Sequence, residues 1–252
     1  MKELLIPSSF DRSSEPSLFL EPFVPNAPLV VGLHTWSCDR FNQVNAMKPL
    51  CAERGWALLL PEFRGPNLTG NPRAQQACAS KLAMQDIIDA VDWALSHYDI
   101  NPALTFLLGG SGGGHMALMT AAYSPQKFAA VSSWVPITNL ALWHSENKNY
   151  AAHIEACCGG TPDQSTNEYA LRSPIEYASQ LAACRLFVHH GRYDSSVPFS
   201  HTVNLAKAIE TFSPSSFFYE IFDGGHEINH LRAFLWFDTV AGKAKASKQL
   251  TG

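Results

Sequence analysis

Short apolar runs alternate with amphipathic stretches along most of the chain. Residues 28–34 (Pro-Leu-Val-Val-Gly-Leu-His) are almost continuously apolar, which is typical of a strand buried on both faces of a parallel sheet. Residues 80–98 place Met84, Ile87 and Val91 at helical spacing, which predicts a helix with one buried face and Ser80 as its N-cap. The hydrophobic pattern therefore predicts strands that alternate with helices.

The order of these elements indicates the fold class. Two short strands come first, separated by a polar stretch, and predict an antiparallel pair. The predicted strands cover residues 3–7, 17–23, 28–34, 56–61, 105–108, 129–135, 185–189 and 217–222, and the predicted helices cover residues 41–53, 80–98, a stretch after residue 111, 200–211 and 228–240. This order predicts an α/β fold: one domain over residues 1–252, with helices on both faces of a mostly parallel eight-stranded sheet. A long connection with little periodicity predicts a small cap insertion at about residues 137–180.

Composition narrows the function classes. The chain is 46% hydrophobic and only 16% charged, so it can bury a large core, and its net charge of −4 argues against a nucleic-acid-binding protein. No apolar run reaches the roughly 18 residues that a membrane span needs, so we expect no membrane partner, and the oligomeric state stays open. The N-terminus does not resemble a signal peptide, which favours the cytoplasm. The six cysteines lack the spacing of a zinc site and are expected to be reduced core thiols.

The strongest local signal is a glycine-rich turn between a predicted strand and a predicted helix. Residues 109–115 read Gly-Gly-Ser-Gly-Gly-Gly-His and contain Gly-x-Ser-x-Gly. In this setting the pattern is typical of a nucleophile elbow, in which a tight turn lifts the serine hydroxyl above the sheet. A phosphate-binding loop is the alternative, but the Lys-Ser/Thr that follows its glycines is missing. Ser111 is therefore the predicted nucleophile.

A serine nucleophile needs a base and an acid that orients the base. Asp194 follows the predicted strand at 185–189, and His226 follows the predicted strand at 217–222. This chain order, Ser then Asp then His, is the order found in α/β hydrolases. Asp194 as a simple turn residue and Asp223 as the acid are the alternatives, although Asp223 lies too near His226 along the chain to orient it easily. The predicted triad is Ser111, His226 and Asp194.

At these positions the chain resembles the α/β-hydrolase catalytic domain of the prolyl oligopeptidase family and its esterase relatives. The resemblance spans about residues 30–237. It rests on the elbow and on four further segments: Glu62-Phe63-Arg64-Gly65, Ser173-Pro174-Ile175, His190-Gly191 followed by Asp194 and Val197-Pro198, and Gly225-His226. It implies an α/β-hydrolase fold, the same triad and no cofactor. The family's peptidases usually carry an N-terminal β-propeller that screens substrates by size, whereas here about thirty residues precede the core.

The backbone amides of Gly112 and Trp36 are the predicted oxyanion donors. Gly112 follows the nucleophile, and Trp36 stands in His34-Thr35-Trp36, where esterase relatives often have His-Gly-x. Aromatic and polar side chains near strand ends and in the predicted cap are expected to line the substrate pocket: Trp134, Trp143, His144 and Tyr150.

A second motif competes for His226. Residues 226–230 read His-Glu-Ile-Asn-His and match the His-Glu-x-x-His zinc signature. That signature requires a helix with both histidines on one face, whereas Gly224 and Gly225 place His226 at the end of a loop. We therefore expect no metal.

The predicted reaction is acyl transfer to water, and three function classes remain. A carboxylesterase acting on small acyl or acylated-carbohydrate esters is favoured, because no size-filtering domain is evident and esters need less leaving-group activation than amides. A stand-alone serine peptidase or aminopeptidase of the prolyl oligopeptidase type is the first alternative. A non-enzymatic protein with the hydrolase fold is the second.

Overall fold

The structure, a computed structural model, describes the backbone of residues 1–250 and the side chains of residues 1–242. Eight strands form one sheet in the order β1-β2-β4-β3-β5-β6-β7-β8. Their bounds are β1 Lys2–Pro7, β2 Ser14–Leu20, β3 Ala27–Leu33, β4 Ala57–Pro61, β5 Ile100–Gly110, β6 Ala130–Trp134, β7 Leu186–Gly191 and β8 Phe217–Phe222. The first strand pairs are antiparallel and all pairs from β4 to β8 are parallel, so the predicted sheet is confirmed.

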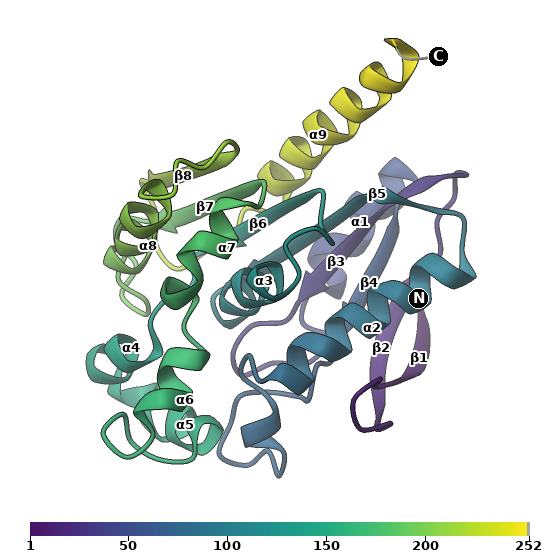
Figure 1. Ribbon diagram of the computed structural model, residues 1–252. Coiled ribbons are helices and arrows are strands. Elements are labelled where there is room, and N and C mark those ends of the chain that lie inside the picture. Colours follow the sequence, from purple (N-terminus) through teal and green to yellow (C-terminus); the bar gives the residue numbers. More distant parts are fainter. Residues whose placement is uncertain (251–252) are drawn as a thin grey trace.

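Helices cover both faces of this sheet (Figure 1). Their bounds are α1 Val44–Arg54, α2 Lys81–His97, α3 Gly112–Tyr123, α4 Leu140–Glu146, α5 Lys148–Cys158, α6 Thr166–Leu171, α7 Ala178–Ala182, α8 Ser200–Glu210 and α9 His230–Leu250, with 3-10 turns η1 Ala74–Gln76 and η2 Pro174–Tyr177. Ser80 caps α2 as predicted, because its hydroxyl accepts the N–H of Ala83. No helix within residues 1–250 is long and apolar enough to cross a membrane.

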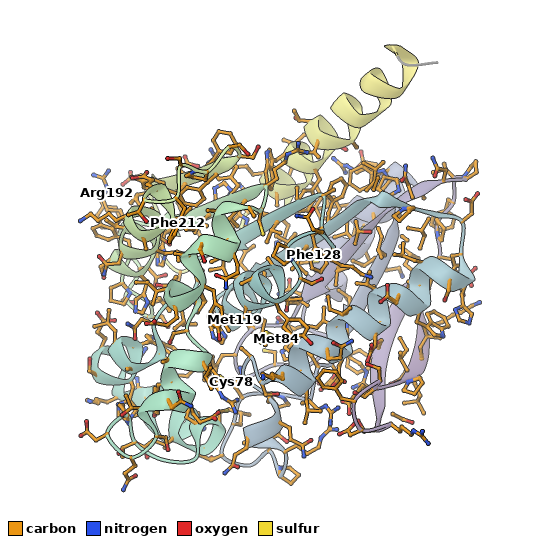
Figure 2. The ribbon with its side chains drawn as sticks, in the orientation of Figure 1. Cys78, Met84, Met119, Phe128, Arg192 and Phe212 are labelled. Atoms are coloured by element: carbon orange, nitrogen blue, oxygen red, sulfur yellow. The ribbon has the colours of Figure 1, made fainter. Side chains whose placement is uncertain are left out.

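The alternation of side chains along the central strands builds two cores. Leu29, Val31 and Leu33 of β3 face the layer of α2, α3 and α8. Val30 faces the opposite layer, which is formed by α1 and α9. Met84 of α2 and Met119 of α3, both labelled in Figure 2, belong to the first layer. Both faces of β3 are therefore buried, as its continuous apolar run predicts.

Strand β2, at Ser14–Leu20, begins and ends three residues earlier than predicted, and two other parts of the chain differ more from the sequence prediction. Strand β5 begins at Ile100 rather than Thr105, because Ile100 already pairs with Ala27 of β3. The register shifts before Leu29 pairs with Thr105, so the segment with Pro102 is an irregularity within the strand. The connection after β6 is helical: α4, α5, α6 and η2 lie in it, and Figure 1 places α4, α5 and α6 beyond one end of the sheet. Asn139 and Asn147 are the N-caps of α4 and α5. Helices α4 and α6 have only 7 and 6 residues, which is too few for a clear hydrophobic periodicity. We call residues 137–180 the insertion.

Candidate active site

The glycine-rich turn has the geometry of a nucleophile elbow. Ser111 stands between β5 and α3 with φ 55° and ψ −123°, a conformation that costs a side-chain-bearing residue free energy. A Cβ on Gly109 would lie 2.1 Å from the carbonyl oxygen of Gly113, so no larger residue fits at the start of the turn. Val135, at the end of β6, is also held at positive φ and lines the same cavity as Ser111. Two residues with strained backbone, Ser111 and Val135, therefore line the cavity.

Asp194 and His226 meet as the sequence predicts. His226 Nδ1 lies 2.7 Å from Asp194 Oδ2, although 32 residues separate them along the chain. Asp194 Oδ1 accepts the backbone N–H groups of Ser196 and Val197. Ser111 and His226 line one cavity of about 430 Å³. No hydrogen bond joins the Ser111 hydroxyl to His226 in the described chain, which is common in sites without substrate.

Hydrogen bonds set the charge of Asp194. Burial works to raise its pKa, but hydrogen bonds from His190, His226 and the amide of Val197 outweigh burial and hold the pKa well below its ordinary value. His190 is fully buried. Its Nε2 lies 2.8 Å from the Val197 carbonyl oxygen and 3.3 Å from Asp194 Oδ2, and its Nδ1 lies 2.8 Å from the hydroxyl oxygen of Thr202. Asp194 is therefore an ionised carboxylate facing His226.

The two predicted oxyanion amides lie close together. A Cβ on Gly112 would sit 2.5 Å from the backbone nitrogen of Trp36, so only glycine lets the two backbones approach this closely. Gly112 is the first residue of α3, where the N–H has no partner within the helix and the helix dipole favours negative charge. The arrangement can bind an oxyanion beside Ser111.

The structure brings one of the four expected pocket residues to the cavity. Tyr150 lines it, from the start of α5. Trp134 stacks on His189 and borders a neighbouring hollow, while Trp143 is buried against Trp36. His144 pairs with Glu155 inside the insertion.

Several cavity residues were not anticipated from the sequence, and their shared feature is position: they follow β3, β6 or β8. They are Thr35, Ser37, Cys38, Val135, Ile228 and His230. Closer attention to the residues just after each parallel strand could have found them, because the carboxyl ends of parallel strands meet at one edge.

The two histidines of the His-Glu-x-x-His motif contact other side chains rather than each other. His226 binds Asp194, and His230 Nε2 lies 2.8 Å from Gln43 Oε1. Within the part of the chain that the structure describes, no group of three His, Cys, Asp or Glu side chains is placed to hold a metal ion.

Comparison with known proteins places this site in a family. The family model described as the prolyl oligopeptidase family matches residues 42–235. The chain belongs to the prolyl oligopeptidase family. Among curated relatives, the uncharacterized peptidase YtmA of Bacillus subtilis is 25% identical over 173 residues, which cover 66% of this chain and 65% of YtmA. Acylamino-acid-releasing enzyme 2 of rice is 24% identical over 239 residues, which cover 90% of this chain and 29% of the enzyme.

A solved structure confirms the α/β-hydrolase fold. The puromycin-hydrolyzing peptidase of Mycobacterium tuberculosis superposes with a TM-score of 0.76 at 19% identity, covering 92% of this chain and 37% of that one. The chain thus spans less than two thirds of the length of each of these relatives.

The family corrects the favoured function. The carboxylesterase prediction is wrong, since the matching family is a peptidase family, and YtmA and the Mycobacterium tuberculosis protein are peptidases by description. The error lay in arguing from a size filter: such a filter governs which molecules reach a site and does not determine which bond the site cleaves. The ester substrate that this prediction included is therefore not retained.

Proposed function

We propose that this prolyl oligopeptidase family member is a serine peptidase that uses Ser111, His226 and Asp194. The observation that carries the proposal is the 2.7 Å contact between His226 Nδ1 and Asp194 Oδ2, made beside a cavity that Ser111 also lines. An ionised, buried carboxylate fixes the imidazole so that Nε2 is free to accept a proton. Membership of a peptidase family supports the amide bond as the target.

The reaction follows from these positions. His226 Nε2 takes the Ser111 proton as the hydroxyl oxygen attacks the peptide carbonyl, and the amides of Gly112 and Trp36 stabilise the oxyanion. His226 then protonates the leaving amine, and the C–N bond breaks to leave an acyl-enzyme. Water, deprotonated by His226, releases the acid and restores Ser111.

The walls of the cavity favour uncharged substrate groups. In the described chain, the residues lining it include no Asp, Glu, Lys or Arg, and Trp36, Val135, Tyr150 and Ile228 supply apolar surface. A free ammonium or carboxylate placed there would lose water without gaining an ionic partner. We therefore propose that the enzyme cleaves after an uncharged residue whose own amino group is acylated or part of a chain.

Chromogenic anilides test the proposal. We expect N-acetyl-alanine p-nitroanilide to be cleaved with a higher kcat/KM than alanine p-nitroanilide or the N-acetyl-glutamate and N-acetyl-lysine anilides. EDTA should leave the rate unchanged, and a fluorophosphonate should abolish it. If p-nitrophenyl esters are turned over while no anilide or peptide is cleaved, the peptidase proposal fails.

The pH dependence follows from the lowered pKa of Asp194. A carboxylate with a lowered pKa stays ionised, and contributes its share of folding stability, down to pH values below the ordinary pKa of an aspartate. Asp194 therefore stays ionised where the folded enzyme works, and we expect its protonation to add nothing to the fall in kcat/KM on the acid side. The slope of log kcat/KM against pH gives the number of protons that cause this fall, and we expect one. A slope that requires two protons would contradict the prediction.

A further inference from the structure

Two side chains of the insertion donate hydrogen bonds to one carbonyl group of the Asp194 loop. The Ser196 carbonyl oxygen accepts the indole N–H of Trp143 at 2.9 Å and the side-chain amide N–H of Asn147 at 3.0 Å. Trp143 belongs to α4, and Asn147 is the N-cap of α5. Two helices of the insertion therefore hold one atom of the loop that carries the predicted acid.

That carbonyl shares a peptide unit with a hydrogen bond to Asp194. The Ser196 C=O and the Val197 N–H are the two ends of one planar group and point in opposite directions. The Val197 N–H donates to Asp194 Oδ1 at 2.9 Å. Fixing the carbonyl from the insertion side therefore fixes the direction of the N–H that holds the carboxylate.

The same indole also contacts the other side of the site. Trp143 is 1% exposed, and its ring packs edge-on against Trp36 with centroids 4.8 Å apart at 71°. Trp36, Trp143 and Val197 belong to one buried apolar cluster. A carbonyl in such surroundings loses hydrogen bonds at a high free-energy cost, since water does not replace them readily.

We propose that Trp143 and Asn147 are positioning residues of the peptidase reaction, acting on Asp194 through the Ser196–Val197 peptide unit. The inference rests on the proposed function, because it assigns them a role in presenting His226 to Ser111. The insertion then fixes the position of the Asp194 loop. The Trp143 ring also packs against Trp36, whose backbone amide is the second proposed oxyanion donor.

Two substitutions remove the donors with little other change. Trp143→Phe deletes the indole N–H and keeps an aromatic ring, and Asn147→Ser keeps an N-cap oxygen for α5 but is too short to reach Ser196. We expect each to lower kcat by about 10-fold with KM nearly unchanged, as befits the loss of one buried hydrogen bond. Asn149→Ala is the matched control, because Asn149 is an exposed residue of the same helix, and it should keep the kinetics of the unmodified enzyme.

A purely structural role would not move the pH profile. A carboxylate with a weakened N–H donor binds the His226 proton more tightly, so the acid limb of kcat/KM should move to higher pH in both variants. The NMR signal of the His226 Nδ1 proton should shift as well, and this signal needs no turnover. A lower melting temperature with unchanged kcat, acid limb and proton signal would overturn the proposal.

The outcomes separate this inference from the proposed function. If Ser111→Ala is inactive while Trp143→Phe and Asn147→Ser match the Asn149→Ala control, the positioning role fails and the peptidase proposal stands. If Ser111→Ala retains peptidase activity, the proposed function itself fails. Should Trp143→Phe not fold, Asn147→Ser alone decides, since its side chain is only half-buried.

Discussion

Ser111→Ala is expected to lower kcat for anilide substrates by on the order of 10⁴-fold or more, because no other group replaces the attacking oxygen. The fold should be unaffected. Alanine meets the same backbone strain at φ 55° that serine already bears, and the side chain becomes smaller. Steady-state kinetics measure the loss, and thermal unfolding measures the stability.

Ser111→Gly supplies the control for strain. Glycine adopts positive φ without a Cβ penalty, so this variant should be equally inactive yet more stable than Ser111→Ala by about 1 kcal/mol or more. Activity within about 10-fold of the unmodified enzyme in either variant would refute Ser111 as the nucleophile.

Arg64→Ala is expected to lower the free energy of unfolding by about 3–5 kcal/mol, because it leaves the buried carboxylate of Asp86 without its cation. Arg64 is 1% exposed and follows β4. Its guanidinium donates to Asp86 of α2 and, at 2.8 and 3.0 Å, to Asp11 in the turn between β1 and β2. Burial raises the pKa of Asp86, whereas Arg64 holds the pKa of Asp11 well below its ordinary value.

The exposed ion pair of Arg232 and Glu220 serves as the control for the loss of stability in Arg64→Ala. Arg232 is 46% exposed, so Arg232→Ala should change the free energy of unfolding by no more than about 1 kcal/mol. Urea unfolding of both variants gives the two values. Equal and small losses would mean that Arg64 does not hold the β1–β2 hairpin against α2.

The parts of the fold predicted from sequence are those with a strong local cause. The continuous apolar run of β3 predicts burial on both faces, and the spacing of Met84, Ile87 and Val91 predicts α2 with its Ser80 cap. The positions of Ser111, Asp194 and His226 follow from one rule, that residues just after parallel strands meet at one edge of the sheet. Chain order and placement after these strands together predicted that His226 lies beside Asp194.

What the sequence did not predict depends on contacts between distant segments. Four aromatic or polar residues were expected in the pocket, and only Tyr150 lines it. Three of the four lie in α4 and α5, whose packing decides which of them reaches the cavity. Trp143 instead contacts Ser196, 53 residues later in the chain, and Trp36, more than 100 residues earlier. No local sequence pattern predicts contacts over such separations. The prediction of an ester substrate was wrong because the same three catalytic residues can cleave either an ester or an amide bond.

The most direct test of a serine peptidase centred on Ser111 combines covalent labelling with turnover. Purified protein is treated with a fluorophosphonate in steps, while N-acetyl-alanine p-nitroanilide hydrolysis is followed and the adduct is located by peptide mapping. We predict that peptidase activity falls in proportion to a single adduct on Ser111 and reaches zero when labelling is complete. Full labelling of Ser111 with anilide cleavage retained, or inactivation through an adduct at another residue, would contradict the account.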